Sequence, residues 1–256
     1  MRTEQAAGGM AAAERLWELQ RRDAGSASRG LNLEQILEAA IALADERGVA
    51  DLSMATIARE LGYSTMALYR HVSGKADLLE AMVDVAVGPP PADIHEPEDW
   101  RAQMTAWSMA LATAYRRHQW VFDVPISGPP VMPNSVRWME AGLRILKQTG
   151  LAAGEQVGVL TAITSYVRGI EQLLAQYMRY GRSPRIRPVT YGEMLTRLLP
   201  KGELPVLEGL VAAGVFGGNV SEGMIEEHER DLLFGLDRLL DGIQLLIDEH
   251  RAEDRI

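Results

Sequence analysis

The sequence predicts an all-α protein, and three observations support that fold class. Ala, Leu, Glu, Arg and Met are abundant, whereas the strict apolar–polar alternation of half-buried strands is scarce. Apolar residues instead recur at the three- and four-residue spacing of an amphipathic helix. Residues that cap or stop helices, chiefly Ser, Asn, Gly and Pro, divide the chain at helix-length intervals. Because 47% of the 256 residues are apolar, these helices can bury a substantial core.

The composition also excludes several kinds of site and location. The chain has no cysteine, so it forms neither disulfides nor thiolate metal sites, which fits a reducing compartment. No apolar run approaches the ~20 residues that span a bilayer. The first residues lack the basic start and long apolar stretch of a signal peptide. We therefore expect a cytoplasmic protein.

The first 29 residues are expected to form an arm that is partly disordered. One short amphipathic helix is predicted near 11–22, and residues 23–30, DAGSASRG, have the composition of a linker.

Short helices with well-marked ends are predicted between residues 30 and 88. Asn and Ser residues stand where they can accept hydrogen bonds from first-turn N–H groups, and glycines stand where helices stop. Three consecutive prolines at 89–91 end the last of these helices and mark a domain border. The first predicted helix is capped by Asn32 and ends at Gly48, and the second is capped by Ser53 and ends at Leu61, before Gly62. The third is capped by Ser64 and spans 65–71, and the fourth spans 75–87.

Longer helices are predicted after this border. They are expected at 97–117, 134–149, 155–180 and 228–253, with short helices near 191–199 and 205–213 inside a Gly- and Pro-rich loop at 181–227.

Residues 53–71 have the spacing of a helix-turn-helix: a helix, a glycine turn and a second short helix. Gly62 stands where the turn needs a residue without Cβ. The apolar residues that would hold the two helices at a fixed angle are Ile57, Ala58, Leu61, Leu68 and Val72. The turn alone fits an ordinary helical hairpin equally well.

The distribution of charge favours a nucleic-acid surface at this point. The formal net charge of −9 argues against nucleic acid when taken alone. Between Leu61 and Ala76, however, there is no acidic residue, while Arg70, His71 and Lys75 are present. A surface that lies against phosphates requires such a local absence of acidic side chains. The exposed face would show Thr65, Met66, Ala67, Tyr69, Arg70 and His71, which suit contacts to phosphates and base edges.

Two of these residues have a structural alternative. Tyr69 could be a rim residue of the small core. His71 could satisfy the last carbonyls of its helix.

Several segments resemble the TetR family of transcriptional regulators. LEQILEAAIALADERG at 33–48, LSMATIARELG at 52–62, STMALYRHVSGK at 64–75 and DLL at 77–79 resemble its first four helices. Residues 100–175, with RRHQW at 116–120 and ISGPP at 126–130, are similar to the ligand domain of the tetracycline-repressor subgroup. So is FGLDRLLDGI at 234–243.

The resemblance implies a three-helix helix-turn-helix DNA-binding domain at 30–88 and a larger helical ligand-binding and dimerisation domain at 89–256. It implies a ligand-responsive repressor that binds a palindromic operator as a homodimer and is released by a small, largely apolar effector. Base contacts are implied for Thr65–Ala67 and Arg70, and phosphate contacts for Ser53, Tyr69, His71 and Lys75. The predicted DNA-binding set is Ser53, Ser64, Thr65, Met66, Ala67, Tyr69, Arg70, His71 and Lys75. Arg70 stands where many members have another residue, which suggests an operator of its own.

The arm at 1–29 is longer than the family requires. Its Arg21, Arg22 and Arg29 could reach an adjacent groove of the DNA. A disordered tail fits the roughly balanced charge of the arm equally well.

Candidate effector-binding residues are Met104, Trp107 and Leu111 on one helical stripe, with Trp138 and Tyr166 on later helices. Aromatic rings and methionines line pockets for apolar ligands, but for any one of these residues core packing is the commoner role. Arg168 and Glu171, one helical turn apart, either pair on the surface or orient a polar group of the ligand. No metal and no cofactor is predicted.

The last helix is expected to contribute to a homodimer. Its stripe of Leu232, Leu236, Leu239, Ile243 and Leu246 would form a seam with a partner helix, while Leu233, Leu240 and Ile247 would face the chain's own core. The family resemblance implies a four-helix interface built from helices 155–180 and 228–253 and their symmetry mates.

Two other classes compete with this interpretation. An enzyme is disfavoured because the five histidines are scattered and no P-loop, dinucleotide fingerprint or nucleophile elbow is present. A helical adaptor with a vestigial DNA module is the second rival.

Overall fold

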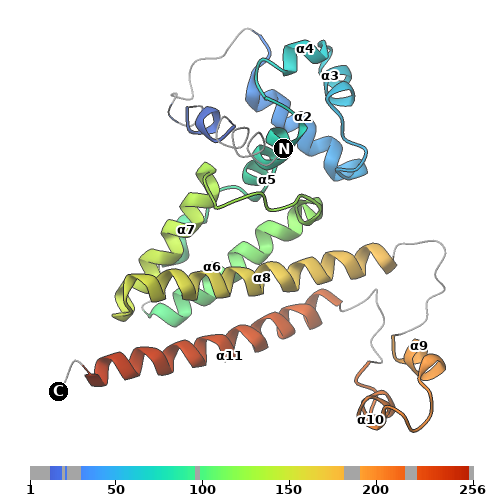
Figure 1. Ribbon diagram of the computed structural model, residues 1–256, viewed down its shortest axis with the longest axis vertical. Coiled ribbons are helices and arrows are strands. Elements are labelled where there is room, and N and C mark those ends of the chain that lie inside the picture. The colour runs from blue at the N-terminus through green and yellow to red at the C-terminus, as the bar shows by residue number, and fades with distance from the viewer. Residues whose placement is uncertain are drawn as a thin grey trace. The chain divides into compact units, whose positions relative to one another are not determined.

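The computed structural model describes residues 12–18, 21, 30–95, 99–181, 191–216 and 224–253. Within these ranges every regular element is a helix, as the sequence predicts (Figure 1). The chain divides into two compact units, one made of residues 1–165 with 246–256 and the other of residues 166–245. Among the described residues, no helix combines the length and apolarity that a membrane span needs.

From residue 33 the larger unit forms a bundle of short helices: α2 (Leu33–Arg47), α3 (Met54–Leu61), α4 (Thr65–Leu68) and α5 (Lys75–Val87). Two of the three predicted caps are present, those of Asn32 and Ser53, whereas Ser64 makes no side-chain cap bond to α4. Asn32 Oδ1 accepts the N–H of Gln35 at 2.8 Å, and Ser53 Oγ accepts the N–H of Thr56 at 3.1 Å. Each N–H would otherwise lack a partner at a helix start, which is why these sequences begin helices there.

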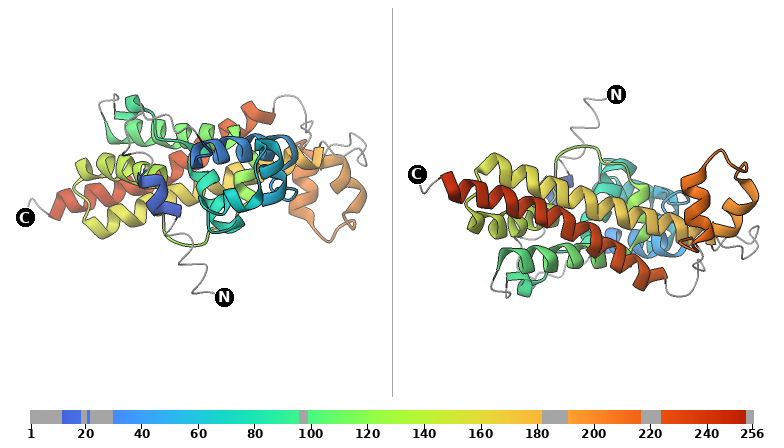
Figure 2. Two further views of the ribbon diagram at one scale, coloured as in Figure 1. Left: turned by 90° about the horizontal axis from the view of Figure 1, so that it is seen from above. Right: turned by 90° about the horizontal axis from the view of Figure 1, so that it is seen from below.

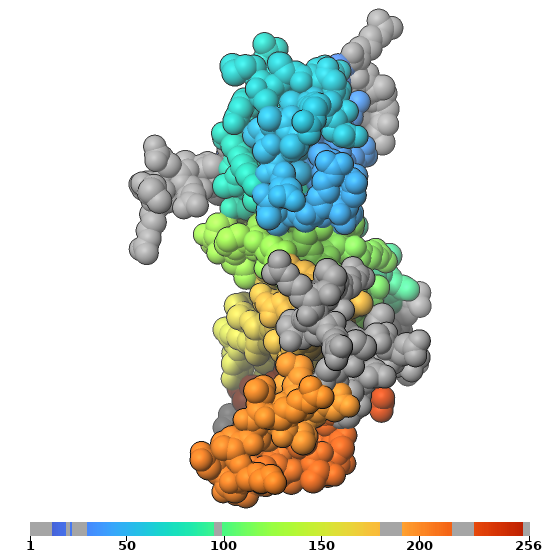
Figure 3. Space-filling model, turned by 90° about the vertical axis from the view of Figure 1, so that its right-hand side faces the viewer, coloured from blue at the N-terminus to red at the C-terminus, as the bar shows by residue number. Residues whose placement is uncertain are grey.

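The core of this bundle comes from one face of each helix. Its fully buried members include Ile36, Leu37, Ile57, Leu68 and Leu78. In Figure 3 the helices α2–α5 form the surface coloured blue to cyan.

Helix α4 is shorter than the predicted 65–71. It ends at Leu68, and the N–H groups of Arg70 and His71 donate to the carbonyls three residues earlier, at 3.4 and 2.8 Å. Such bonds tighten the end of a short helix into a turn.

The larger unit continues with α6 (Trp100–Arg117) and α7 (Pro133–Leu146), and with short 3₁₀ helices η1 (Ala92–His95), η2 (Gln119–Asp123) and η3 (Lys147–Thr149). Helix α6 starts three residues later than the predicted 97, because Asp99 Oδ1 accepts the N–H of Ala102 at 2.8 Å and so caps it.

Two tryptophans hold α6 to α7. The rings of Trp107 and Trp138 meet edge to face with centroids 5.6 Å apart, and Trp107 Nε1 donates to the carbonyl of Trp138 at 3.1 Å. A Cβ at Gly142 would lie 3.4 Å from the Trp107 ring and would clash with Leu160. The glycine therefore lets α7 approach both α6 and the start of the next helix.

The two longest helices, α8 (Ala153–Gly181) and α11 (Met224–Glu253), run antiparallel and side by side (Figures 1 and 2). In the larger unit, His250 Nε2 lies 2.9 Å from Glu155 Oε1. In the smaller unit, the Tyr166 hydroxyl donates to the carbonyls of Asp231 and Leu232 at 3.1 and 3.0 Å.

Glu171 does not lie on the surface, which was one of the two predicted roles for it. It is 1% exposed, and its Oε1 lies 3.1 Å from Nε2 of His228 on α11. A buried carboxylate requires such a partner, and this one comes from a helix more than fifty residues away.

The predicted division of α11 into a partner face and a core face is wrong at three positions. Leu232 and Leu236, assigned to the partner seam, are buried within their own chain together with Leu240 and Ile247. Leu233, assigned to the core, is exposed. The buried residues recur at four- and seven-residue steps, so they form a single stripe on the helix, and Leu233 lies beside it.

The smaller unit also holds α9 (Tyr191–Leu198) and α10 (Pro205–Ala212). Tyr191 and Phe216 meet edge to face at 5.5 Å, and the N–H of Gly192 donates to the carbonyl of Phe216 at 2.9 Å. These contacts close the α9–α10 segment on itself.

Candidate nucleic-acid interface

The turn between α3 and α4 has the geometry that the sequence predicts. Gly62 has φ +73°, in the left-handed region that side chains disfavour. The N–H of Tyr63 donates to the carbonyl of Ala58 at 2.9 Å, which fixes the turn. Four of the five predicted pinning residues, Ile57, Ala58, Leu68 and Val72, are buried, and Leu61 is half-buried.

The predicted contact residues gather on one surface at α4 and the turn after it. Met66 is 70% exposed and Tyr69 47%, and Arg70 is exposed as well. Thr65, Ala67 and His71 are half-buried beside them. Leu68 points the other way and is fully buried, so it anchors the helix and leaves this face to solvent.

The other three predicted residues stand at helix starts. Ser53 caps α3, Ser64 precedes α4 without making a side-chain cap bond, and Lys75 opens α5. Lys75 is exposed, and its Nζ donates to the carbonyl of Val49 at 3.4 Å. The N-termini of α3 and α5 carry partial positive charge and so favour phosphate nearby.

Two residues at this surface were not among the predicted ones. Tyr63 is 46% exposed directly after the turn glycine, and this position was the available clue in the sequence. Arg15 donates a hydrogen bond to the carbonyl of His71, and no local pattern predicts that contact. Burial, then the charges of Arg15 and Arg70, lower the pKa of His71, so three basic groups stand close together.

Two carboxylates, Asp84 on α5 and Asp45 on α2, attach these helices to the rest of the larger unit. Asp84 on α5 accepts the N–H groups of Asn134 and Ser135 at 3.0 and 2.8 Å, and so caps α7. Just beyond α5, the carbonyl of Gly88 accepts Trp138 Nε1 at 2.9 Å. Helix α5 is thereby fastened to the helix that carries Trp138.

The second attachment starts from α2. Asp45 accepts Trp120 Nε1 at 2.7 Å, and His118 Nδ1 lies 2.8 Å from the same carboxylate oxygen. Both partners follow the end of α6, which carries Trp107 and Leu111. Each helix that carries candidate effector residues in this unit is thus linked to the helix-turn-helix bundle.

The candidate effector residues of the larger unit lie in its core. Met104, Trp107, Leu111 and Trp138 are all buried. Tyr166, in the smaller unit, uses its hydroxyl to bind the backbone of α11. Their role in effector binding stays a prediction.

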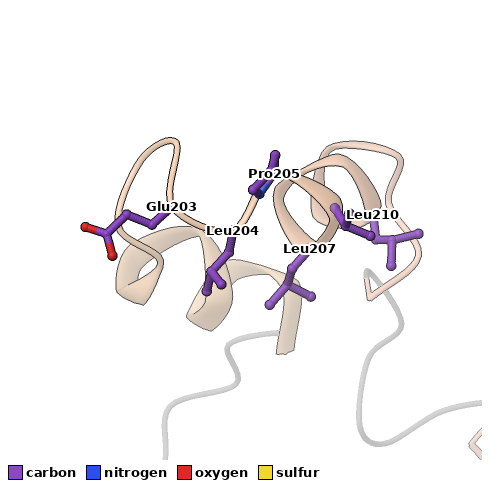
Figure 4. Close-up of a pocket in the computed structure, with 6 residues that line it drawn as sticks. Glu203, Leu204, Pro205, Leu207 and Leu210 are labelled. Carbon is purple, nitrogen blue, oxygen red and sulfur yellow. The ribbon is translucent and has the colours of Figure 1, made fainter.

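An apolar pocket of about 360 Å³ lies on α10 in the smaller unit (Figure 4). Glu203, Leu204, Pro205, Val206, Leu207 and Leu210 line it. None of the candidate effector residues is among them.

Comparison with protein families supports the interpretation of both halves of the chain. Residues 36–82 match the family described as bacterial regulatory proteins, tetR family. Residues 94–247 match the family described as tetracyclin repressor-like, C-terminal domain.

Individual relatives agree with these matches. The chain is 34% identical over 246 residues to the HTH-type transcriptional repressor DrrR1 of Streptomyces coeruleorubidus, covering 94% of this chain and 87% of that protein. Among solved structures, its fold is similar to apo ActR from Streptomyces coelicolor, with a TM-score of 0.70 and 21% identity over 87% of this chain and 99% of that one. ActR in complex with actinorhodin gives a TM-score of 0.65 at 20% identity, over 85% and 97% of the two chains.

Proposed function

Because the chain belongs to the TetR family of bacterial transcriptional regulators, we propose that it is a repressor that binds a palindromic operator as a homodimer and releases it when a small, largely apolar effector binds. The family and the relatives are regulators, so the chain is not an enzyme. The observation that carries the proposal is the exposed, acid-free face of α4, held by a left-handed glycine turn.

The proposed domains are an arm at 1–29, a DNA-binding domain at 30–88 and a ligand-binding and dimerisation domain at 89–256. We propose that the protein is cytoplasmic, because a bacterial repressor works where the DNA is.

The specific roles proposed here are those that the resemblance to the family implies. The Thr65–Ala67 corner and Arg70 read base edges, because Arg binds guanine through two acceptors and the methyl-bearing side chains pack on thymine. Ser53, Ser64, Tyr69, His71 and Lys75 contact phosphates and set the register of α4 on the duplex.

The homodimer uses the outer face of α8 together with α11. The residues exposed on α8 between 157 and 177 are all uncharged: Val157, Gly158, Thr161, Ala162, Ser165, Gly169, Leu173, Gln176 and Tyr177. An uncharged face of this length in an acid-rich chain suits the core of an interface, where charged residues are depleted. On α11 the exposed Phe234 and Leu245 add apolar area.

The effector is proposed to bind around Met104, Trp107, Leu111, Trp138 and Tyr166. One fold neighbour, ActR, was crystallised with actinorhodin. The aromatic and thioether side chains of this set suit an aromatic, largely apolar ligand.

Selection from a random pool of duplex DNA tests the proposal. The protein should enrich one inverted repeat, with half-sites ~34–36 Å apart or a multiple of that distance, as a twofold dimer requires. Gel shifts with the enriched duplex then give the affinity. If the pool stays random after repeated rounds, the chain is an adaptor whose DNA module no longer reads sequence.

A further inference from the structure

The N-terminal segment 12–18 is helical and docked, although it precedes both regions that match the family. Ala12, Ala13 and Leu16 are 3%, 4% and 1% exposed, whereas Glu14 and Glu18 are exposed. One face of the segment is therefore buried against the larger unit and the other faces solvent. If the segment did not pack against the domain, the Leu16 side chain would be exposed to water.

Two neighbouring side chains fasten this segment to two different places. Arg15 donates to the carbonyl of His71, at the end of the turn that follows α4. Trp17 Nε1 donates to the carbonyl of Val131, just before α7, at 3.1 Å. The guanidinium carbon of Arg137 on α7 lies 5.9 Å from the centre of the Trp17 ring.

These contacts form a connection that does not pass through α5. Helix α4 has only four residues, so few backbone bonds hold its far end. Arg15 adds a bond at the end of the turn that follows α4, and Trp17 ties the same segment to the residues just before α7.

We propose that residues 12–18 form a strap that positions α4 for DNA, with Arg15 and Trp17 as its positioning residues. The strap joins the end of α4 to the start of α7 and restricts the orientations that α4 samples. The restriction lowers the ordering entropy that must be lost on binding, so the strap raises DNA affinity. This inference rests on the proposed function for its link to DNA.

The test compares Arg15→Met and Trp17→Phe with the control Glu18→Ala on the exposed face of the same segment. Trp17→Phe keeps an aromatic ring but loses the indole N–H and so the hydrogen bond to Val131. Hydrogen exchange of the free protein reports on the amides of His71 and Val72, which both donate to the carbonyl of Leu68. Both strap variants should exchange faster there, and the control should match the wild type.

Affinity is measured for a duplex that the wild type selects from a random pool. The strap variants should bind roughly three- to tenfold more weakly with an unchanged salt dependence, and Arg15→Lys should restore most of the affinity. In Arg15→Met, the His71 pKa measured by NMR should rise, because a nearby cation has been removed.

Three results would overturn the strap. Unchanged exchange at His71 and Val72 in both variants would show that the contacts do not hold α4. Wild-type affinity in both variants would show that any such restraint does not act on DNA binding. A salt slope reduced by about 1 in Arg15→Met would show that Arg15 touches a phosphate instead. If the wild type selects no duplex, the proposed function fails, and exchange alone still decides whether the strap restrains α4.

Discussion

At the scale of single residues, Gly235 and Tyr166 show how one position sets the spacing of two helices. The Tyr166 ring lies against Gly235, and its hydroxyl donates to two carbonyls of α11. Burial and the nearby charge of Asp231 raise the pKa of Tyr166, so the phenol stays protonated and remains a donor. A Cβ at Gly235 would lie 2.7 Å from the ring carbon Cζ, closer than atoms pack.

Gly235→Ala should therefore destabilise the protein by about 1–3 kcal/mol, because the ring must move and its hydrogen bonds are lost. Gly242→Ala on the same helix is the matched control, since no neighbour lies within 4 Å of the added methyl. The control should be neutral or stabilising by up to about 1 kcal/mol, from helix propensity alone. Urea denaturation measures both, and equal effects would contradict this account of the α8–α11 contact.

Asp84 predicts a pH dependence of stability. Burial raises the pKa of Asp84, although hydrogen bonds from Asn134 and Ser135 oppose that shift. With the folded pKa above the unfolded one, the folded state holds the proton more tightly, so the contribution of Asp84 is greatest at low pH. It is lost as pH rises through the raised pKa. The free energy of unfolding of the wild type minus that of Asp84→Asn should thus fall from about pH 4 toward neutrality.

Ser135→Ala sharpens this prediction. It removes one hydrogen bond that lowers the pKa of Asp84, so the fall should shift to higher pH. Urea titrations at a series of pH values measure the difference. A difference that rises with pH would mean that Asp84 is held mainly by its hydrogen bonds rather than disfavoured by burial.

At the scale of elements, α4 and α5 divide the proposed work on DNA. Arg70 is exposed on the turn after α4, whereas Lys75 stands at the N-terminus of α5. Arg70→Ala should weaken binding by about 1–3 kcal/mol and relax sequence preference, as the loss of one base contact does. Lys75→Ala should weaken all sequences alike and reduce the salt slope by about 1. Gel shifts at several salt concentrations separate the two, and equal loss of specificity would refute the assigned roles.

Four of the five proposed effector residues lie on α6 and α7. The segment after α6 is fastened to α2 through Asp45, and α7 is fastened to α5 through Asp84. An effector that moves α6 or α7 must therefore strain these attachments. When the effector binds the moved arrangement of these helices more tightly than the original one, effector binding lowers DNA affinity, typically by ~1–3 kcal/mol.

Trp107→Phe is the sharper test of the pocket, because Trp107→Ala would remove a fully buried ring and cost about 3–5 kcal/mol of stability. An effector is first found by screening aromatic compounds. Release of DNA from the Trp107→Phe variant should then need a different effector concentration, while its DNA affinity without effector should equal that of the wild type. Thr113→Ala, on the exposed side of α6, is the control. An unchanged release curve would place the effector elsewhere.

At the scale of the whole molecule, the proposed dimer makes the outer face of α8 the critical surface. Ala162 is exposed on this face, so a substitution there tests the interface.

Ala162→Glu should shift a wild-type dimer toward monomer and abolish operator binding, because it buries an unpaired charge at the interface. Thr113→Glu places the same charge on the exposed side of α6 and should leave the dimer intact. Sedimentation velocity measures both. A wild-type monomer that binds its operator would remove the dimer from the proposal.

The sequence by itself determined the helical class, most helix ends and the face of α4. Asn32, Ser53 and Gly62 act on backbone groups within four residues of themselves, so local chemistry sets these boundaries. The exposed face of α4 follows equally locally, from a single buried Leu68 in a one-turn helix.

Only the tertiary structure decided which residues meet across long sequence distances. Three features depend on partners more than fifty residues away: the buried stripe of α11, the Glu171–His228 pair and the contact of Arg15 with His71. Helical periodicity shows on which face of a helix an apolar or charged residue lies, but it does not identify the residue that packs against that face. The sequence therefore does not predict the attachments of α2 and α5, because the packing of the helices decides which partner a side chain meets.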